Sequence, residues 1–368
     1  MKIFYPLFLL SFLLGISNQS SAQQKTVDLL SEISAEVNQD SLSSYILSLQ
    51  NLKTRYALAD NRKEVALWIK QKFESFGYQN VKLDSFFLDY NNYNLMQYNV
   101  ICESDSVYDH DDYVLLGAHH DAITHSNPMD STPGADDNAS GVAGVLEAAR
   151  ILKMHGGNSK IPFHFATWAA EELGLHGSKY YVQKHLANGT LPLFYLNLDM
   201  IANATNGNRK VNYVVTSNLS YLLDVASDYS EVEPISASNG GGSDHMPFIS
   251  ERVPILYFAE NNFSEYYHSD QDRLENLELD YAKEVVRATA TALYFGANAI
   301  PLVEVEQVIN AGNGDDFIIT WKKEDYAIGY RIDLFSGESL IQSLETTGDS
   351  LYISGLPANQ EVCYELYG

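Results

Sequence analysis

The run YVLLGA at residues 113–118 opens the part of the sequence that decides the fold. Two further apolar runs follow it, IPFHFATW at 161–168 and LPLFYLNL at 191–198, and helical patterns separate them at about 140–154 and 178–186. Apolar strands that alternate with helices are typical of parallel sheets covered on both faces. The sequence therefore predicts an α/β fold with a mainly parallel, mixed sheet and helices on both faces.

Patterns on either side extend this domain. Residues 27–78 have a helical pattern, and strand-like runs follow at 81–88 and 98–103. A further strand is expected at 254–259 and a closing helix at 279–297. We therefore expect the domain to occupy residues 23–300.

From residue 301 the pattern changes to short alternating strands at 317–321, 330–334 and 351–356, separated by Gly, Asp and Ser. This indicates a small all-β sandwich over residues 301–368. Trp321, the Gly355-Leu356-Pro357 step and Tyr364 resemble a fibronectin type III domain that is short and lacks its last strand. We expect this segment to stabilise the larger domain or to contact a surface or substrate.

Composition excludes several classes of function. The chain has 368 residues, 45% of them hydrophobic, so it can bury a large core. Its formal net charge of −25 disfavours nucleic acid and anionic membranes as partners, because phosphate binding requires clustered Lys and Arg. The composition leads to no prediction of oligomeric state.

The N-terminus has the pattern of a secretory signal peptide. An apolar run at 4–16 follows Lys2, and Ser20-Ser21-Ala22 precedes polar residues, so residues 1–22 are expected to be removed. The run is shorter than the roughly 20 residues that a spanning helix needs, so no membrane insertion of the mature chain is expected. Export is predicted, either to the periplasm or out of the cell. Cys102 and Cys363 are expected to be unpaired thiols.

Polar residues follow the ends of three predicted strands. His119 follows the first, Glu171 and Glu172 follow the second, and Asp199 follows the third. Ligands in such folds bind beyond the carboxyl ends of the strands. We therefore expect these side chains to meet in one site.

Two stretches, GAHHD at 117–121 and PGADDNASG at 133–141, resemble the zinc-dependent bacterial leucyl aminopeptidase family, which is related to glutaminyl cyclases and glutamate carboxypeptidases. The resemblance covers about residues 55–297, and five motifs occur in the order of the family. It implies a zinc metallopeptidase that acts on peptide substrates and holds two Zn²⁺ per chain. The implied metal ligands are His119, Asp137, Glu172, Asp199 and His268.

In the family, the carboxylate that bridges the ions lies three residues before a serine, here Ser140. The resemblance therefore implies that Asp137, and not the neighbouring Asp136, is the bridging ligand. His119 and Asp199 would complete one site, and Glu172 and His268 the other. Two Zn²⁺ carry four positive charges, which three carboxylates and a hydroxide would neutralise. The metal-free site would repel itself, so metal should stabilise the folded protein. The resemblance also implies a cis peptide bond between Asp137 and Asn138.

Glu171 matches the general base of the family. It would take a proton from the water that attacks the peptide carbonyl and return it to the leaving amine. Tyr267 resembles a tyrosine that stabilises the oxyanion in some members, although a core or pocket-wall tyrosine is an alternative. Asp121 would hold the far nitrogen of His119, and Asp272 that of His268.

A further signature, Ser243-Asp244-His245 with Phe248, is expected at the start of a helix. Ser243 is a candidate N-cap residue. We expect Ser243, Asp244 and Phe248 to form a wall of the substrate pocket.

Three alternatives to an aminopeptidase remain. A carboxypeptidase would bind a terminal carboxylate, usually with arginine, but only Arg252 and Arg273 lie near the motifs. A glutaminyl cyclase on the same fold works with one zinc and departs from the full set of ligands, which this chain retains. A binding protein on an inactive peptidase fold would have lost ligands or the base.

Overall fold

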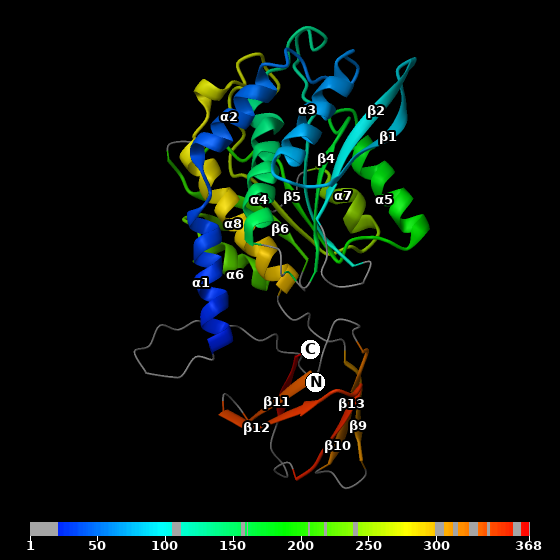
Figure 1. Cartoon of the computed structure of the whole chain (residues 1–368), viewed down its shortest axis with the longest axis vertical. Coiled ribbons are helices and arrows are strands. Elements are labelled where there is room, and N and C mark those ends of the chain that lie inside the picture. Colours follow the sequence, from blue (N-terminus) through cyan, green and yellow to red (C-terminus); the bar gives the residue numbers. More distant parts are fainter. Residues whose placement is uncertain are drawn as a thin grey trace. The chain divides into compact units, whose positions relative to one another are not determined.

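A computed structural model describes residues 21–104, 112–155, 159, 161–204, 207–216, 219–237, 242–298, 305–311, 316–323, 330–336, 339–355 and 362–367 (Figure 1). The contacts divide the chain into two compact units, one containing Leu13–Ala297 and one containing Asn298–Gly368. The apolar run at 4–16, predicted to belong to a signal peptide, lies outside the described residues. Within the described ranges, no helix combines the length and apolar character needed to cross a membrane.

An eight-stranded mixed sheet forms the centre of the larger unit, in the order β1-β2-β4-β3-β5-β8-β6-β7 (Figure 1). The pairs β3·β4, β3·β5, β5·β8 and β6·β7 are parallel, whereas β1·β2, β2·β4 and β6·β8 are antiparallel. The predicted α/β class with a mainly parallel, mixed sheet is therefore confirmed. The strands are β1 Asn80–Tyr90, β2 Tyr93–Glu103, β3 Val114–His119, β4 Phe163–Trp168, β5 Phe194–Leu198, β6 Lys210–Val215, β7 Glu233–Ser236 and β8 Ile255–Glu260.

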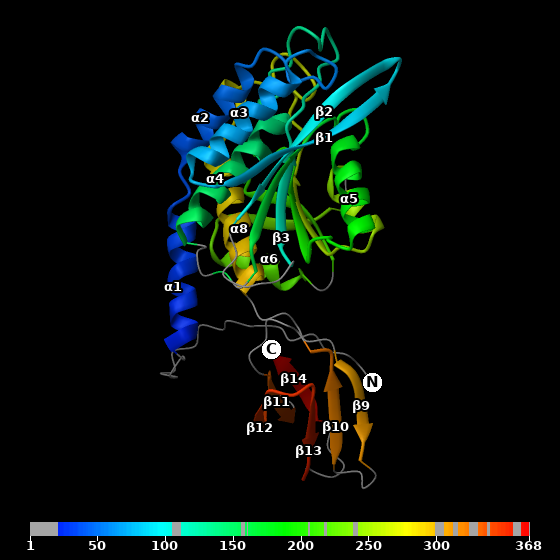
Figure 2. The same cartoon turned by 45° about the vertical axis from the view of Figure 1, so that its right-hand side comes forward.

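Helices cover both faces of this sheet. Figures 1 and 2 show α3, α4 and α8 on one face and α5 and α7 on the other. The 27–78 pattern forms three separate helices, because turns break it near Val37 and between Asn51 and Asn61. The helices are α1 Ser21–Ala35, α2 Gln39–Gln50, α3 Arg62–Ser75, α4 Gly141–His155, α5 His176–Asn188, α6 Tyr221–Asp228, α7 His245–Ser250 and α8 Leu279–Asn298.

Three elements between residues 210 and 236 were not predicted: β6, α6 and β7. β6 is half-buried along most of its length, and β7 is a four-residue strand at the edge of the sheet. Neither has the continuous apolar run of a central strand. β6 pairs with β8 and β7 pairs with β6. Such pairing between distant segments cannot be predicted from the local sequence pattern.

The core lies along the central parallel strands. Every residue of β3 and β5 is buried, and in β4 only His164 is partly exposed. Phe165 of β4 is fully buried, with its ring centroid 6.2 Å from that of Phe73 and 5.8 Å from that of Tyr78. These strands form a rigid platform whose carboxyl ends carry the polar residues considered below.

The smaller unit contains two three-stranded antiparallel sheets, in the orders β13-β10-β9 and β12-β11-β14. Its core is built from residues of both sheets, with Trp321 of β10 and Ile332 of β11 almost completely buried. The predicted strands at 317–321, 330–334 and 351–356 correspond to β10, β11 and β13. The strands are β9 Val305–Asn310, β10 Phe317–Trp321, β11 Tyr330–Ser336, β12 Ser339–Thr346, β13 Ser350–Ile353 and β14 Cys363–Tyr367.

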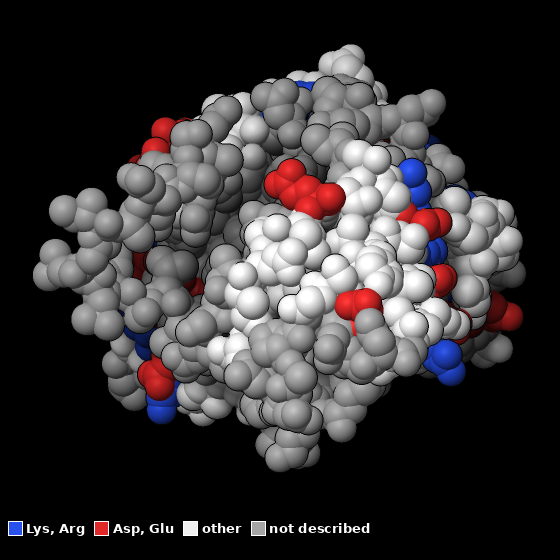
Figure 3. Space-filling view, turned by 90° about the horizontal axis from the view of Figure 1, so that it is seen from below, with Lys and Arg blue, Asp and Glu red and all other residues white. Residues whose placement is uncertain are grey.

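Charged side chains are dispersed on the face drawn in Figure 3. Asp and Glu occur there in small groups, with Lys and Arg beside some of them and uncharged residues between. Among the described residues in this view, no broad basic patch is present.

The core position of Phe165 leads to a test of the fold. Phe165→Ala should lower the free energy of unfolding by about 3–5 kcal/mol, because burial is lost and a cavity remains. Phe87→Ala is the matched control, since the Phe87 side chain is 70% exposed, and it should change stability by less than about 0.5 kcal/mol. Guanidinium unfolding followed by circular dichroism measures both. Equal losses would contradict the assignment of this core.

Candidate metal centre

The predicted site residues converge at one edge of the sheet. His119 is the last residue of β3, Glu171 and Glu172 follow β4, and Asp199 directly follows β5. His268 lies in the loop after β8, where its backbone has a positive φ of 53° and its carbonyl accepts the N–H of His125. Since β3, β4, β5 and β8 form a continuous parallel set, their carboxyl ends bring these residues together.

Asp137 lies between the two histidines. Its Oδ1 is 3.3 Å from His119 Nε2, and its Oδ2 is 3.1 Å from His268 Nε2. His119 Nε2 also lies 3.2 Å from Asp199 Oδ1, and His268 Nε2 lies 3.1 Å from Glu172 Oε2. Each imidazole nitrogen thus faces one oxygen of Asp137 and one oxygen of a second acid.

Two overlapping groups of side chains have the spacing of cation ligands. Within each group, one donor atom per residue lies within 4.8 Å of the others: His119, Asp137 and Glu172 in the first, and His119, Glu171 and Asp199 in the second. Imidazole nitrogens mixed with carboxylate oxygens suit Zn²⁺. Glu172 is held for this role, because its Oε1 accepts the Ile123 N–H at 3.1 Å while Oε2 faces His268.

The electrostatics of the cluster follow from buried acids around two imidazoles. Burial by itself would lower the pKa of His119, but Asp199 and the other acids raise it well above its ordinary value. Burial likewise opposes the charged form of His268, whereas Asp137 and Glu172 raise its pKa to about 10. The pKa of Asp137 is held well below its usual range by the two histidines, against the effect of burial. A cation would therefore compete with protons for these nitrogens.

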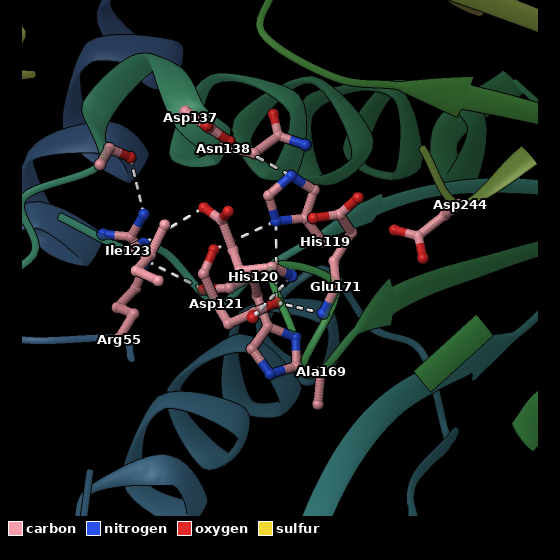
Figure 4. Close-up of polar contacts among 12 residues, drawn as sticks. Arg55, His119, His120, Asp121, Ile123, Asp137, Asn138, Ala169, Glu171 and Asp244 are labelled. Atoms are coloured by element: carbon pink, nitrogen blue, oxygen red, sulfur yellow. Dashed lines mark hydrogen bonds and ion pairs between the residues drawn. The ribbon is translucent and has the colours of Figure 1, made fainter. Parts of the chain in front are cut away.

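Glu171 points into the same space as His119 (Figure 4). Burial, with Asp244 and Asp199 nearby, raises the pKa of its carboxyl group well above the usual value, against the opposing effect of His119. Among the described residues, no hydrogen bond is made to the Glu171 carboxylate. It is therefore the acid of the cluster that remains available to a substrate.

The turn at Ala135–Ser140 presents Asp137 to the site. Gly134 precedes it with φ +48°, and a Cβ there would lie 2.5 Å from both Ala122 Cβ and Asp137 O, so only glycine fits. The Asp137–Asn138 peptide bond is cis, as expected. Asp136 turns away, since its Oδ1 accepts the Ala202 N–H at 2.9 Å.

Asn138 was missed by the sequence analysis. Its Nδ2 donates to Leu198 O at 3.0 Å, and its Oδ1 accepts the N–H groups of Gly141 at 2.9 Å and Met200 at 3.2 Å. Leu198 and Met200 flank Asp199, so one buried amide holds the backbone on both sides of that acid. A buried amide beside a predicted ligand was the available signal, because it must find partners.

Asp121 lies beside the far nitrogen of His119, as predicted, and contacts it in two ways. The atom nearest to His119 Nδ1 is the backbone carbonyl of Asp121, at 3.1 Å, whereas the carboxylate Oδ1 lies 3.7 Å away. The carboxylate also accepts the N–H groups of Glu171 at 3.0 Å and Glu172 at 3.3 Å. Asp121 therefore holds His119 through its carbonyl and, at longer distance, its carboxylate, and the same carboxylate holds the backbone of the two glutamates.

The prediction that Asp272 holds His268 is wrong. Its Oδ1 accepts the Asp136 N–H at 2.8 Å, and its Oδ2 accepts the Asp137 N–H at 3.0 Å. These two amides begin the turn that carries Asp137, where free N–H groups need acceptors. Asp272 therefore fixes the turn that presents Asp137.

Ser243, Asp244 and Phe248 do not form an exposed pocket wall, because each is at most 1% exposed. Ser243 Oγ accepts the Asn197 amide at 2.8 Å and makes no side-chain cap at α7. Asp244 accepts the Ser178 hydroxyl, and burial raises its pKa to about 7. Phe248 stacks on Tyr195 with centroids 4.1 Å apart. These residues are therefore part of the buried interior next to β5.

Tyr267 lies at the surface of the cluster. Its ring stacks on His268 with centroids 3.7 Å apart, and the residue is 38% exposed. Burial, followed by the charges of Asp137 and Glu172, raises its pKa, so the phenol keeps its proton at neutral pH. A protonated hydroxyl can donate to a substrate oxygen, and the predicted oxyanion role stays a prediction.

With this geometry established, comparison with known proteins identifies the family. The family model described as peptidase family M28 matches residues 99–293, which contain every proposed metal ligand. The chain belongs to peptidase family M28. Membership of this family makes the chain an enzyme that hydrolyses peptide bonds.

Several curated relatives of this M28 peptidase are named as aminopeptidases. A probable leucine aminopeptidase of Arthroderma otae is 28% identical over 274 residues, which cover 70% of this chain and 72% of the relative. Aminopeptidase YwaD of Bacillus subtilis is 30% identical over 197 residues, covering 50% of this chain and 41% of the relative. Relatives thus occur in fungi as well as in bacteria, so the resemblance is not restricted to bacterial enzymes.

Solved structures share the fold of this M28 peptidase. The Legionella pneumophila LapA aminopeptidase aligns with a TM-score of 0.64 at 23% identity, covering 81% of this chain and 80% of that one. BSAP, a zinc aminopeptidase from Bacillus subtilis, aligns with a TM-score of 0.61 at 17% identity, covering 71% of this chain and 95% of that one. The fold is therefore that of known aminopeptidases.

The contacts of Asn138 lead to a test that does not depend on metal. Asn138→Asp replaces a buried donor with an acceptor that faces Leu198 O, and should cost about 1–3 kcal/mol of unfolding free energy. Asn276→Asp is the control, because the Asn276 amide donates to Gln271 O at an exposed position. It should cost less than about 0.5 kcal/mol. Urea unfolding in EDTA measures both, and an equal effect would contradict the role given to Asn138.

Proposed function

We propose that this M28 peptidase is an exported di-zinc aminopeptidase that removes N-terminal residues from peptides. One observation carries the proposal. The two oxygens of Asp137 face two different imidazoles, and each imidazole also faces its own second acid, Asp199 or Glu172. A bridging carboxylate between two ligand pairs is the arrangement that two cations require.

The donor set fits zinc ions. His119, Asp137 and Asp199 would hold one ion, and Asp137, Glu172 and His268 would hold the other. When bound, two zinc ions would polarise the peptide carbonyl and lower the pKa of a water molecule. They would also offset the excess of negative charge, which supports their presence in the folded enzyme.

Glu171 is the proposed general base and acid. Its carboxylate has no hydrogen-bond partner among the described residues and lies beside His119 (Figure 4). It can therefore take a proton from the attacking water and deliver it to the leaving amine. Asp121 supports this role, since its carboxylate accepts the N–H group of Glu171 and fixes the backbone there. Tyr267 is proposed to donate to the oxyanion.

Charge near the site favours an amine over a carboxylate as the terminal group of the substrate. Arg252 is exposed and Arg273 donates to Asp270 O, so neither is placed as a carboxylate clamp by the contacts described. The surrounding acids would instead attract a substrate ammonium. The names of the relatives also support an aminopeptidase. A glutaminyl cyclase, with one zinc on this fold, is the alternative.

Two further parts of the proposal concern the two end segments of the given sequence. The pattern over residues 1–22 supports export by a signal peptide, to the periplasm or out of the cell. The three-plus-three arrangement of β9–β14 supports a fibronectin type III-like sandwich that lacks its last strand. We propose that residues 301–368 stabilise the larger domain or contact a surface or substrate, and that they take no part in the chemistry.

Glu171→Gln tests the base. The amide cannot accept a proton, so kcat should fall by at least about 100-fold, while zinc content stays unchanged because Glu171 is not a proposed ligand. Glu265→Gln is the control, since Glu265 is exposed on the loop that carries His268. Kinetics with a leucyl anilide and metal analysis measure both quantities. Unchanged kcat in Glu171→Gln would refute the assignment.

Metal content and substrate choice test the aminopeptidase proposal. Chelation should abolish hydrolysis, and titration with zinc should restore it with saturation at two ions per chain. Leucyl substrates should be cleaved, whereas N-acetylated peptides should not, because they lack the terminal ammonium. Saturation at one zinc together with cyclisation of glutaminyl peptides would instead identify a cyclase.

A further inference from the structure

Arg55 is a buried cation that belongs to none of the motifs above. The residue is only 3% exposed and lies outside residues 99–293, which match the family model. Its Nε donates to His120 O at 2.9 Å, one terminal nitrogen donates to Pro133 O at 2.6 Å, and the other donates to Gly134 O at 2.6 Å. Every nitrogen of the guanidinium is therefore used in a hydrogen bond to the main chain.

The three acceptors belong to the two segments that carry proposed zinc ligands. His120 directly follows His119 at the end of β3, whereas Pro133 and Gly134 lead into the turn that presents Asp137. The planar guanidinium thus connects the backbone at His120 with the backbone at Pro133 and Gly134. Figure 4 shows Arg55 on the side of Asp121 that faces away from Glu171.

The main chain of Arg55 strengthens the same connection. Its N–H donates to Thr132 Oγ1 at 2.6 Å, and its carbonyl accepts the Ala122 N–H at 3.3 Å. Thr132 precedes the Asp137 turn, and Ala122 follows Asp121 on the His119 segment. Arg55 therefore contacts both segments through its backbone as well as through its side chain.

The charge of Arg55 also suits this place. Burial lowers the pKa of the guanidinium to about 10, against the effects of Asp272 and Asp121, so it remains cationic at neutral pH. A cation whose three nitrogens each donate to a carbonyl oxygen offsets part of the negative charge of the acids without occupying a metal position. Since the residue is only 3% exposed and each guanidinium nitrogen already donates to a carbonyl oxygen, Arg55 is not placed to bind a substrate carboxylate.

We propose that Arg55 is a positioning residue that sets the spacing between His119 and Asp137 and thereby the affinity of the site for zinc. This inference rests on the proposed metal function. A residue that only stabilised the fold would lower stability and leave metal affinity unchanged. Groups that orient metal ligands from behind typically change metal affinity by about 10–100-fold when they are lost.

Two substitutions separate geometry from charge. Arg55→Met removes both the donors and the charge, whereas Arg55→Lys keeps the charge but loses the planar guanidinium. Arg62→Met is the matched control, because Arg62 also donates to two backbone carbonyls, Met96 O and Ala59 O. Neither carbonyl belongs to a segment that carries a proposed zinc ligand. Circular dichroism establishes that each variant is folded.

The primary measurement is zinc affinity by competition with a chromogenic chelator. Arg55→Met and Arg55→Lys should each bind zinc at least about 10-fold more weakly than the wild type, and Arg62→Met should match the wild type within about 2-fold. At saturating zinc, kcat should fall in both Arg55 variants while KM changes little, because Arg55 does not touch substrate. Wild-type affinity in both Arg55 variants would overturn the inference.

Wild-type zinc affinity in Arg55→Lys alone would also overturn the inference. The positive charge, and not the planar guanidinium, would then account for the zinc affinity. If Arg55→Met does not fold, Arg55→Lys and Arg55→Gln are judged by the same criteria. The readout is independent of the proposed activity. A wild-type protein that binds zinc but cleaves no aminoacyl substrate would refute the aminopeptidase, while the affinities of the variants would still decide the role of Arg55.

Discussion

The carboxylate of Asp137, held between His119 and His268, is the interaction on which the rest of the site depends. Each oxygen lies 3.1–3.3 Å from a different imidazole nitrogen, so a single side chain defines the separation of two ligand pairs. This arrangement places opposite charges in a largely buried space. It is stable only when protons or cations offset the surrounding acids, and that requirement connects the structure of the site to its proposed chemistry.

The scaffold positions these ligands by hydrogen-bonding the backbone that carries them. Asp272 accepts the N–H groups of Asp136 and Asp137, Asn138 holds the residues flanking Asp199, and Asp121 accepts the N–H groups of both glutamates. Ligands are thus positioned mainly through main-chain contacts. Such contacts leave the ligand oxygens and nitrogens free to face the centre of the site.

The fold is shared with solved aminopeptidases of low sequence identity. BSAP shares only 17% of aligned residues with this chain, yet the folds align with a TM-score of 0.61. Buried strand residues can change while their apolar character is kept, because packing tolerates conservative exchange. Strand ends are less tolerant, since a ligand must reach a defined point in space. The mixed sheet therefore acts as a platform whose edge carries the chemistry.

The sequence by itself determined the α/β class, the strands β3, β4, β5 and β8, and the residues that meet at their ends, because these depend on apolar runs and local motifs. It did not predict β6 and β7, whose pairing depends on partners distant in sequence. Only the tertiary structure decided that Asp272 binds the backbone of the turn that carries Asp137 and that Ser243 and Asp244 are buried. It also decided that Arg55 joins two ligand segments, because a hydrogen bond between residues some 65 to 79 positions apart leaves no local pattern.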